Sequence, residues 1–146
     1  MKKILTVTLC LVMSVLAIFS VGCAKNKEDI VNNLTEARYE VDYDSDKEYI
    51  AYLVSDVLTG GERVDDYLFE PECFEWVVEG YHEVLDEECM VFVFKCTANS
   101  IARDIAKQAR RNKDEIREIF EGENFKVKRS GSLVFIGQKQ AIRAAR

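Results

Sequence analysis

Residues 90–96 read Met-Val-Phe-Val-Phe-Lys-Cys, and this stretch decides the class of the fold. Hydrophobic residues occupy both sets of alternating positions, so neither side of the segment is suited to contact with water. A strand of this kind is typically central in its sheet, with other structure packed on both of its faces. The stretch therefore predicts a central strand in a domain with a sizeable core.

The segment after this strand has the pattern of one long helix that ends near residue 120. Residues 97–100 supply polar side chains that can cap its first turn. Hydrophobic residues then recur at helical spacing, while Lys and Arg occupy the other sides. The predicted inward face consists of Ile101, Ile105, Ala109, Ile116 and Phe120.

The clearest hairpin lies near the end of the chain. Residues 125–128 alternate between hydrophobic and basic, residues 130–131 (Ser-Gly) are typical of a tight turn, and residues 133–136 form the return strand. Gly137 is expected to end that strand. Residues 138–145 are expected to form a short closing helix.

Before the central strand, the pattern predicts a helix, a strand and a second helix. Residues 27–37 place hydrophobic side chains on one helical face, and residues 39–43 alternate as a strand does. Residues 44–46 (Asp-Ser-Asp) offer turn and capping chemistry for the second helix, and residues 60–61 (Gly-Gly) are expected to end it.

Residues 72–84 fit two structures, because their hydrophobic positions suit one face of a helix as well as a strand of a hairpin. We favour a strand that ends near Tyr81 or Val84. Together the elements predict an α+β domain. It is expected to be a two-layer sandwich with a mostly antiparallel sheet of four or five strands and helices on one face, ferredoxin-like or related.

The first 22 residues have the organisation of a secretory signal, since two lysines precede an uncharged stretch over residues 4–21. The stretch ends in Ser-Val-Gly-Cys at residues 20–23, which resembles the lipobox of bacterial lipoproteins. The resemblance implies transfer of diacylglycerol to the Cys23 thiol, cleavage after Gly22, and acylated Cys23 as the new N-terminus. Ser20 stands where the family more often has leucine.

This resemblance divides the chain into a cleaved lipoprotein signal peptide (1–22), a lipidated tether (23–27) and a single α+β domain (28–146). It implies anchoring by acyl chains such as palmitate at the extracytoplasmic face of the cell membrane. Two or three acyl chains, at roughly 0.8 kcal/mol per buried CH₂, bind far more firmly than one. The sequence between VFVFKC (91–96) and SGSLVFIG (130–137) also resembles small lipoproteins of unknown function from Gram-positive bacteria, which implies no activity.

Two other interpretations of the N-terminus remain open. In the first, the signal peptide is an ordinary one and Cys23 is incidental. In the second, the hydrophobic run is retained as a membrane span, because roughly 18 residues is just long enough to cross a bilayer.

The charge of the chain is unevenly distributed. Residues 23–146 carry 18 basic and 26 acidic side chains, a net charge of −8. Residues 23–100 have a net charge of −14 and residues 101–146 a net charge of +6. Either the two parts neutralise each other on folding, or the surface has two faces of opposite sign. The acidic total and the absence of a recognised motif argue against a nucleic-acid partner.

Of the five cysteines, Cys10 leaves with the signal and Cys23 is assigned to lipid, so three remain. Cys89 and Cys96 are predicted on one strand, roughly 23 Å apart at about 3.3 Å per residue. A disulfide needs Cα atoms within about 7 Å, so these two are not expected to pair. Cys73 can pair with either, or all three can be buried thiols, which we favour.

A search for catalytic and metal-binding motifs gives little. His82 is the single histidine, and no nucleophile elbow or cysteine-protease motif surrounds it. The three remaining cysteines lack zinc-type spacing, and no glycine-rich phosphate loop is present. We therefore predict no cofactor and no catalytic residue.

The aspartates Asp42, Asp44 and Asp46 are the one candidate metal site, for calcium. Calcium loops begin with alternate acidic residues because hard cations take several oxygen ligands from one bend. The rest of the EF-hand pattern fails, since Lys47 stands at its glycine position and Leu53 at its glutamate position. The alternative is that these residues cap the following helix, and we predict no bound metal.

Residues 62–88 contain eleven acids against one arginine, which indicates a solvated acidic surface or a docking face for a cationic protein or peptide. We predict a membrane-anchored, extracytoplasmic lipoprotein of the cell envelope that acts as a non-enzymatic binding domain. One alternative is an envelope enzyme with an unrecognised carboxylate site, marked by a cleft of acids beside Trp76 or Tyr81. The other is a structural or envelope-stress lipoprotein.

Overall fold

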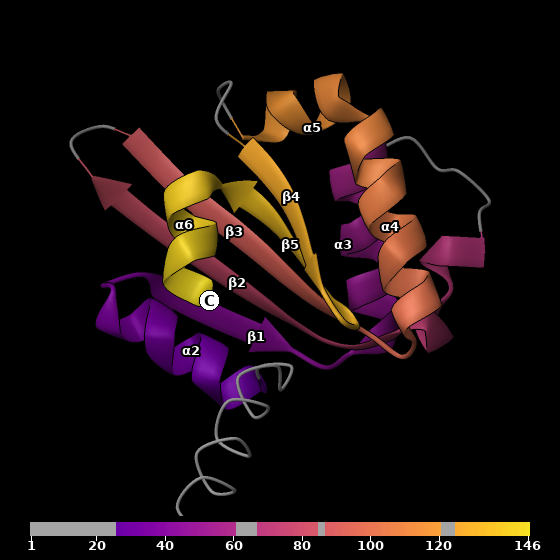
Figure 1. The fold of residues 1–146 in the computed structure, drawn as a ribbon, viewed down its shortest axis with the longest axis horizontal. Helices are drawn as coiled ribbons and strands as arrows, with labels where there is room; N and C mark the ends of the chain where they lie inside the picture. Colours follow the sequence, from indigo (N-terminus) through magenta and orange to yellow (C-terminus); the bar gives the residue numbers. More distant parts are fainter. Residues whose placement is uncertain (1–25, 61–66, 85–86, 121–124) are drawn as a thin grey trace, which may run out of the picture.

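The computed structural model describes residues 26–60, 67–84, 87–120 and 125–146. They form an α+β domain around a five-stranded antiparallel sheet with strand order β1-β2-β3-β5-β4 (Figure 1). The strands are β1 (Glu40–Asp44), β2 (Phe74–Val84), β3 (Glu87–Cys96), β4 (Phe125–Ser130) and β5 (Leu133–Gln138). The helices are α2 (Lys27–Glu36), α3 (Lys47–Thr59), α4 (Asn99–Arg111), α5 (Lys113–Ile119) and α6 (Lys139–Ala145), with short 3₁₀ turns at Tyr67–Phe69 and Pro71–Cys73.

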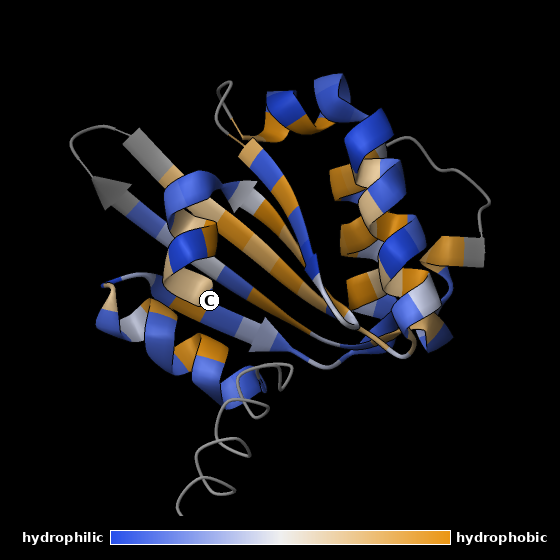
Figure 2. Cartoon of the chain, viewed as in Figure 1, coloured by the Kyte–Doolittle hydropathy of each residue, from blue (hydrophilic) through white to orange (hydrophobic). Residues whose placement is uncertain are grey.

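Strand β3 is the central strand, as its sequence predicts, with β2 on one side and β5 on the other. Its side chains alternate between two cores, because successive residues of a strand point to opposite faces. Phe92 and Phe94 lie in the core beneath α3 and α4, whereas Val91 and Val93 lie in the core beneath α2 and α6. Figure 2 shows the hydrophobic residues running along this strand.

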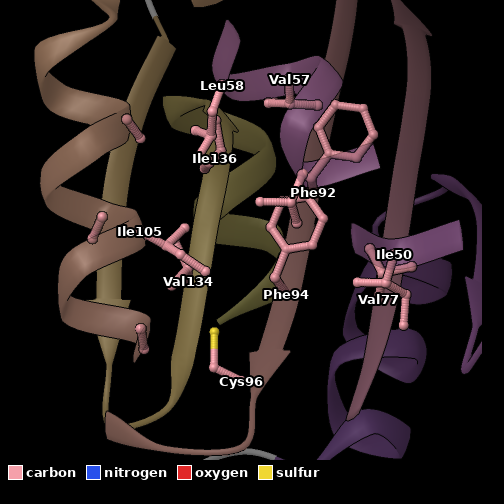
Figure 3. Packing of buried hydrophobic residues seen from close by; sticks show 14 of the residues in the cluster. Ile50, Val57, Leu58, Val77, Phe92, Phe94, Cys96, Ile105, Val134 and Ile136 are labelled. Carbon is pink, nitrogen blue, oxygen red and sulfur yellow. The ribbon is translucent and has the colours of Figure 1, made fainter. Parts of the chain in front are cut away.

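Helices cover both faces of the sheet, so the prediction of a two-layer sandwich with helices on one face is wrong. Helices α3, α4 and α5 pack on one face, where Figure 3 shows Phe92, Phe94 and Val134 pointing toward the helices. Helices α2 and α6 pack on the other face, through Ile30, Leu34, Ala141, Ile142 and Ala145. A central strand with hydrophobic side chains on both of its faces requires helices on both sides of the sheet.

The sheet order also differs from the ferredoxin-like arrangement, in which a strand lies between the two parallel strands of each β-α-β unit. Here β1 and β2 are direct antiparallel neighbours on either side of α3 in the chain. Only the second unit, which runs from β3 through α4 and α5 to β4, has a strand between its two parallel strands, because β5 lies between β3 and β4.

The long helix predicted to reach residue 120 is interrupted at Asn112. The backbone of Asn112 leaves the helical region at φ −93° and ψ 44°, ending α4 and starting α5. Its side-chain Nδ2 donates a hydrogen bond of 2.7 Å to the carbonyl oxygen of Leu58, at the end of α3. Ile116 and Phe120, after the break, lie in the same core as the buried residues of α4.

The other predicted elements are confirmed, including residues 74–84 as a strand and the hairpin of β4 and β5. Strand β5 extends one residue beyond Gly137, to Gln138. Glycine is required at 137 by close approach, because a Cβ atom there would lie 2.2 Å from the carbonyl oxygen of Met90. The absence of a side chain at position 137 therefore allows β5 to lie close to β3 beside Met90 and Val91.

Candidate functional site: an acidic groove beside β1

A groove of about 340 Å³ opens on the α3 side of the sheet, where β1, β2 and β3 run side by side. Its hydrophobic floor is made by Tyr81, Met90 and Phe92, and its rim carries three carboxylates. The lining residues are Glu40, Val41, Asp42, Glu79, Gly80, Tyr81, Met90 and Phe92.

The register of the three strands brings the carboxylates and the floor together. Asp42 lies opposite Glu79, which in turn lies opposite Phe92. Glu40 lies opposite Tyr81, which lies opposite Met90. Residues opposite each other in a sheet share a face. Two rows of side chains therefore point into the groove: Asp42, Glu79 and Phe92 form one, and Glu40, Tyr81 and Met90 form the other.

The floor is held by contacts with the end of α5. The ring of Phe92 packs edge-to-face against Phe120, with ring centroids 5.8 Å apart. Gln138 joins the neighbouring strands: its Oε1 accepts a 2.6 Å hydrogen bond from the backbone N–H of Met90, and its Nε2 donates one of 3.3 Å to the carbonyl of Phe120. The floor of the groove therefore belongs to the packed core.

Glu79 is positioned by the first turn of α3. The Tyr49 hydroxyl donates a hydrogen bond of 3.0 Å to Oε1 of Glu79. Tyr49 is itself fixed because Oδ1 of Asp46, the N-cap of α3, accepts hydrogen bonds from the backbone N–H groups of Glu48 and Tyr49. The helix cap thus orients a side chain that holds one carboxylate of the groove.

The groove has a strongly negative local environment. The pKa of Glu79 is raised, first by partial burial and then by the nearby charges of Asp42 and Asp44, although the Tyr49 hydrogen bond acts in the opposite direction. The pKa of Tyr49 is raised to about 12, by burial, by its hydrogen bond to Glu79 and by the same carboxylates. Burial is the larger cause of both shifts, and the carboxylates of Asp42 and Asp44 act in the same direction.

Among the described residues, no Lys or Arg forms an ion pair with Glu40, Asp42 or Glu79. The two ion pairs between described side chains, Arg103–Asp104 and Arg117–Asp114, both lie within the basic part of the chain. The Nζ of Lys27 lies 4.4 Å from the ring centroid of Tyr43 on β1. The two edge strands of the sheet differ in charge, since β1 is acidic and β4 is basic.

The three aspartates proposed for calcium do not converge. Oδ1 of Asp42 accepts a 2.8 Å hydrogen bond from the backbone N–H of Tyr43, and Oδ1 of Asp44 accepts one of 2.7 Å from that of Asp46. Asp46 caps α3. In the described part of the chain, no group of three or more His, Cys, Asp or Glu side chains is placed to hold a metal ion.

Two other residues singled out in the sequence, His82 and Trp76, do not line the groove. The ring of His82 is half-buried and packs against Tyr39, with ring centroids 5.2 Å apart. Trp76 packs against the core beneath α2 and α6, on the opposite face. Of the two aromatic residues considered as cleft markers, only Tyr81 lines the groove.

A second hollow, of about 290 Å³, lies where the end of α3 meets α4 and α5. Its lining includes Asn112, Glu115 and Glu118. Because the Asn112 amide already bonds to Leu58, this hollow is organised around the helix junction. Phe69 contributes an aromatic side chain to its lining, whereas both Tyr81 and Phe92 line the groove beside β1.

Gly22 and Cys23 lie outside the described residues. Within the described ranges, none of the helices combines the length and hydrophobicity needed to span a bilayer. No protein-family model, no curated protein and no solved structure matches this chain.

Proposed function

We propose that this chain is a lipid-anchored extracytoplasmic protein whose domain binds a cationic protein or peptide segment in the acidic groove. The observation that carries the proposal is the combination of crowded carboxylates with a hydrophobic floor. Carboxylates alone are common on solvated surfaces, but here Glu79 is half-buried beside Tyr81 and Phe92. Such a groove suits a ligand that is both basic and partly hydrophobic.

Lys and Arg side chains meet both requirements. Their aliphatic stems pack on hydrophobic surface while the charged ends stay at the rim. The ring of Tyr81 adds a face for a cation, worth about 0.5–1 kcal/mol at an exposed site. Exposed carboxylates such as Glu40 and Asp42 contribute about 0.2–1 kcal/mol each. These terms predict modest affinity that weakens with salt, because exposed charges are screened.

The proposed location at the outer face of the membrane rests on the lipobox resemblance at Cys23. Helix α2 begins at Lys27, four residues after Cys23, so a lipid on that cysteine would hold the domain close to the bilayer. Intact-mass analysis of the protein from its native membrane fraction tests this part. A mass of residues 23–146 plus acyl groups, lost in Cys23→Ala, supports the anchor. An unmodified mature chain in the medium would refute it.

The binding part is tested by backbone amide NMR with a seven-residue peptide that alternates Lys with Phe or Val. The expected shifts cluster at Asp42, Glu79, Tyr81 and Met90. The control peptide carries Glu in place of Lys and should leave these amides unmoved. Equal shifts with both peptides, or shifts confined to α4, would contradict the assignment of the groove.

A second candidate function is a carboxylate-based envelope enzyme. It is favoured by one observation: Glu79, with a raised pKa, lies across from the exposed carboxylate of Asp42 and beside Tyr81. Glycoside hydrolysis uses a pair of carboxyl groups in different environments, one of which has a raised pKa. Turnover of a fluorogenic oligosaccharide that is abolished in both Glu79→Gln and Asp42→Asn would favour this candidate over simple binding.

A further inference from the structure

Two cysteines are brought together where β2 begins and β3 ends. Phe74, the first residue of β2, lies opposite Cys96, the last residue of β3. The backbone N–H of Thr97 donates a 2.9 Å hydrogen bond to the carbonyl of Cys73, and the Thr97 hydroxyl donates one of 3.1 Å to the carbonyl of Glu72. The backbone at residues 72–74 is therefore held directly against the backbone at residues 96 and 97.

Both side chains enter the same core. Cys73 is 8% exposed and Cys96 is fully buried, and both belong to the cluster beneath α3 and α4. Each carries a thiol in this structure. Cys73 directly precedes Phe74, the residue opposite Cys96, so the two cysteine side chains enter this core from neighbouring backbone positions.

Cys89 is excluded as the partner by its position. It lies seven residues before Cys96 on the same strand, opposite His82, so its side chain points to the other face of the sheet. Cys73 lies at the end of the hairpin away from Cys89. Because Cys73 lies beside Cys96, Cys89 is about as far from Cys73 along the hairpin as it is from Cys96.

We propose that Cys73 and Cys96 form a disulfide when the chain folds in an oxidising compartment, and that Cys89 remains a thiol. The oxidant is a disulfide-bearing protein or an oxidised low-molecular-weight thiol. The thiolate of one cysteine attacks a sulfur of that disulfide, forming a mixed disulfide and releasing one thiol. The second cysteine, as its thiolate, then attacks the mixed disulfide. The Cys73–Cys96 bond forms, and the oxidant leaves as two thiols after gaining two electrons and two protons.

The timing follows from burial. Burial raises the pKa of Cys96 to about 12 and also raises that of Cys73. Exchange requires a thiolate, so both groups react slowly once the core has closed. The bond therefore forms as the domain folds. It would tie the 3₁₀ turn before β2 to the connection between β3 and α4, which closes a loop containing the whole hairpin.

The test uses the full chain with Cys10→Ser and Cys23→Ser, which leaves three cysteines. The chain is refolded in a mixture of oxidised and reduced glutathione, unfolded in denaturant with iodoacetamide, and mapped as peptides. We expect a Cys73–Cys96 linked peptide and alkylation at Cys89 alone. Alkylation of all three cysteines, or a link that includes Cys89, would overturn the proposal.

Melting with and without reductant gives a second readout that does not depend on peptide mapping. The chain refolded with glutathione should lose several degrees of melting temperature when the disulfide is reduced, and Cys89→Ser should behave in the same way. Cys73→Ala should melt at one temperature whether or not reductant is present. A reductant response that persists in Cys73→Ala, or that disappears in Cys89→Ser, would assign the bond to other residues.

Discussion

The hydroxyl of Tyr49 donates a 3.0 Å hydrogen bond to Oε1 of Glu79, joining the first turn of α3 to the middle of β2. This bond fixes a half-buried carboxylate next to Asp42 and Asp44, whose charges oppose its ionisation. The domain therefore keeps an anion in a place where solvation is incomplete and other anions are near. A bound cation would offset that cost, which is why this pair of residues lies at the centre of the proposed function.

The first prediction concerns the stability of Glu79→Gln. The folded-state pKa of Glu79 lies above the ordinary value of 4.5, so the folded chain binds more protons than the unfolded chain between these two values. This contribution to stability is present below the unfolded pKa and is lost as the pH rises through the folded pKa. Gln keeps an oxygen for Tyr49 and cannot ionise. Glu79→Gln should melt a few degrees above the wild type at pH 7.

The pH dependence supplies the control for this prediction. The gain in melting temperature should vanish as the pH falls below about 4, where Glu79 is protonated in both states of the wild type. Glu118→Gln, on the exposed surface of α5, makes the same charge change away from β1 and should show no comparable gain. A Glu79→Gln protein less stable than the wild type at neutral pH would show that the charge is not a burden.

Tyr49→Phe should raise the pKa of Glu79 further. The hydroxyl stabilises the ionised carboxylate, and its hydrogen bond is the one contribution that lowers this pKa. Carbon-13 NMR titration of the Glu79 carboxyl group measures the change directly. Tyr52→Phe, at an exposed position on the same helix, is the matched control and should leave the titration unchanged. A fall in the pKa of Glu79 would mean that the hydrogen bond is absent in solution.

Asp46→Ala should destabilise the domain by about 1 kcal/mol, because it removes an N-cap that accepts two backbone hydrogen bonds. Asp46→Asn preserves an acceptor oxygen and should recover most of the loss in denaturant unfolding. Millimolar calcium should leave the melting temperature unchanged in all three proteins, since the aspartates serve the backbone. A rise in melting temperature that is specific to calcium and lost in Asp46→Ala would revive the metal hypothesis.

Gly137→Ala should be strongly destabilising, by about 3 kcal/mol or more, since its Cβ would meet the Met90 carbonyl oxygen at 2.2 Å and two strands would have to separate. Gly131→Ala tests a different cost. Gly131 has φ +59°, and a Cβ there would make only an ordinary contact with Asn99 Oδ1 at 3.8 Å, so alanine should cost about 1 kcal/mol of backbone strain. Urea unfolding of the two variants distinguishes the cases. Equal losses would mean that β3 and β5 do not approach closely at Gly137.

The sequence was most informative where a local pattern determines structure by itself. The hairpin that turns at Gly131 and the cap at Asp46 both follow from short-range chemistry. The double-sided hydrophobic pattern of Phe92 and Val93 correctly indicated a strand covered on both faces. It was the assembly of helices into a single layer that failed, because periodicity shows that a helix has an inward face without showing which side of the sheet receives it.

The break at Asn112 was not predictable, since it depends on the carbonyl of Leu58, which belongs to a distant helix. The groove was hidden for the same reason. Glu40 and Asp42 alternate on β1, which signals a shared acidic face, but their partners on β2 are fixed only by strand register. From the sequence, Asp42 was considered only as part of a candidate calcium loop that we did not favour, and the structure places it on the rim of a groove.

The most direct test of the central claim is a calorimetric titration of the alternating Lys peptide into the wild type, Asp42→Asn/Glu79→Gln and Glu118→Gln. Both groove substitutions preserve the side-chain oxygens that accept hydrogen bonds. We predict saturable binding to the wild type and to Glu118→Gln that weakens between 50 mM and 500 mM salt. The double variant should bind roughly three- to tenfold more weakly at low salt. Equal affinity for all three proteins, or affinity independent of salt, would contradict the assignment of the groove as a site for a cationic partner.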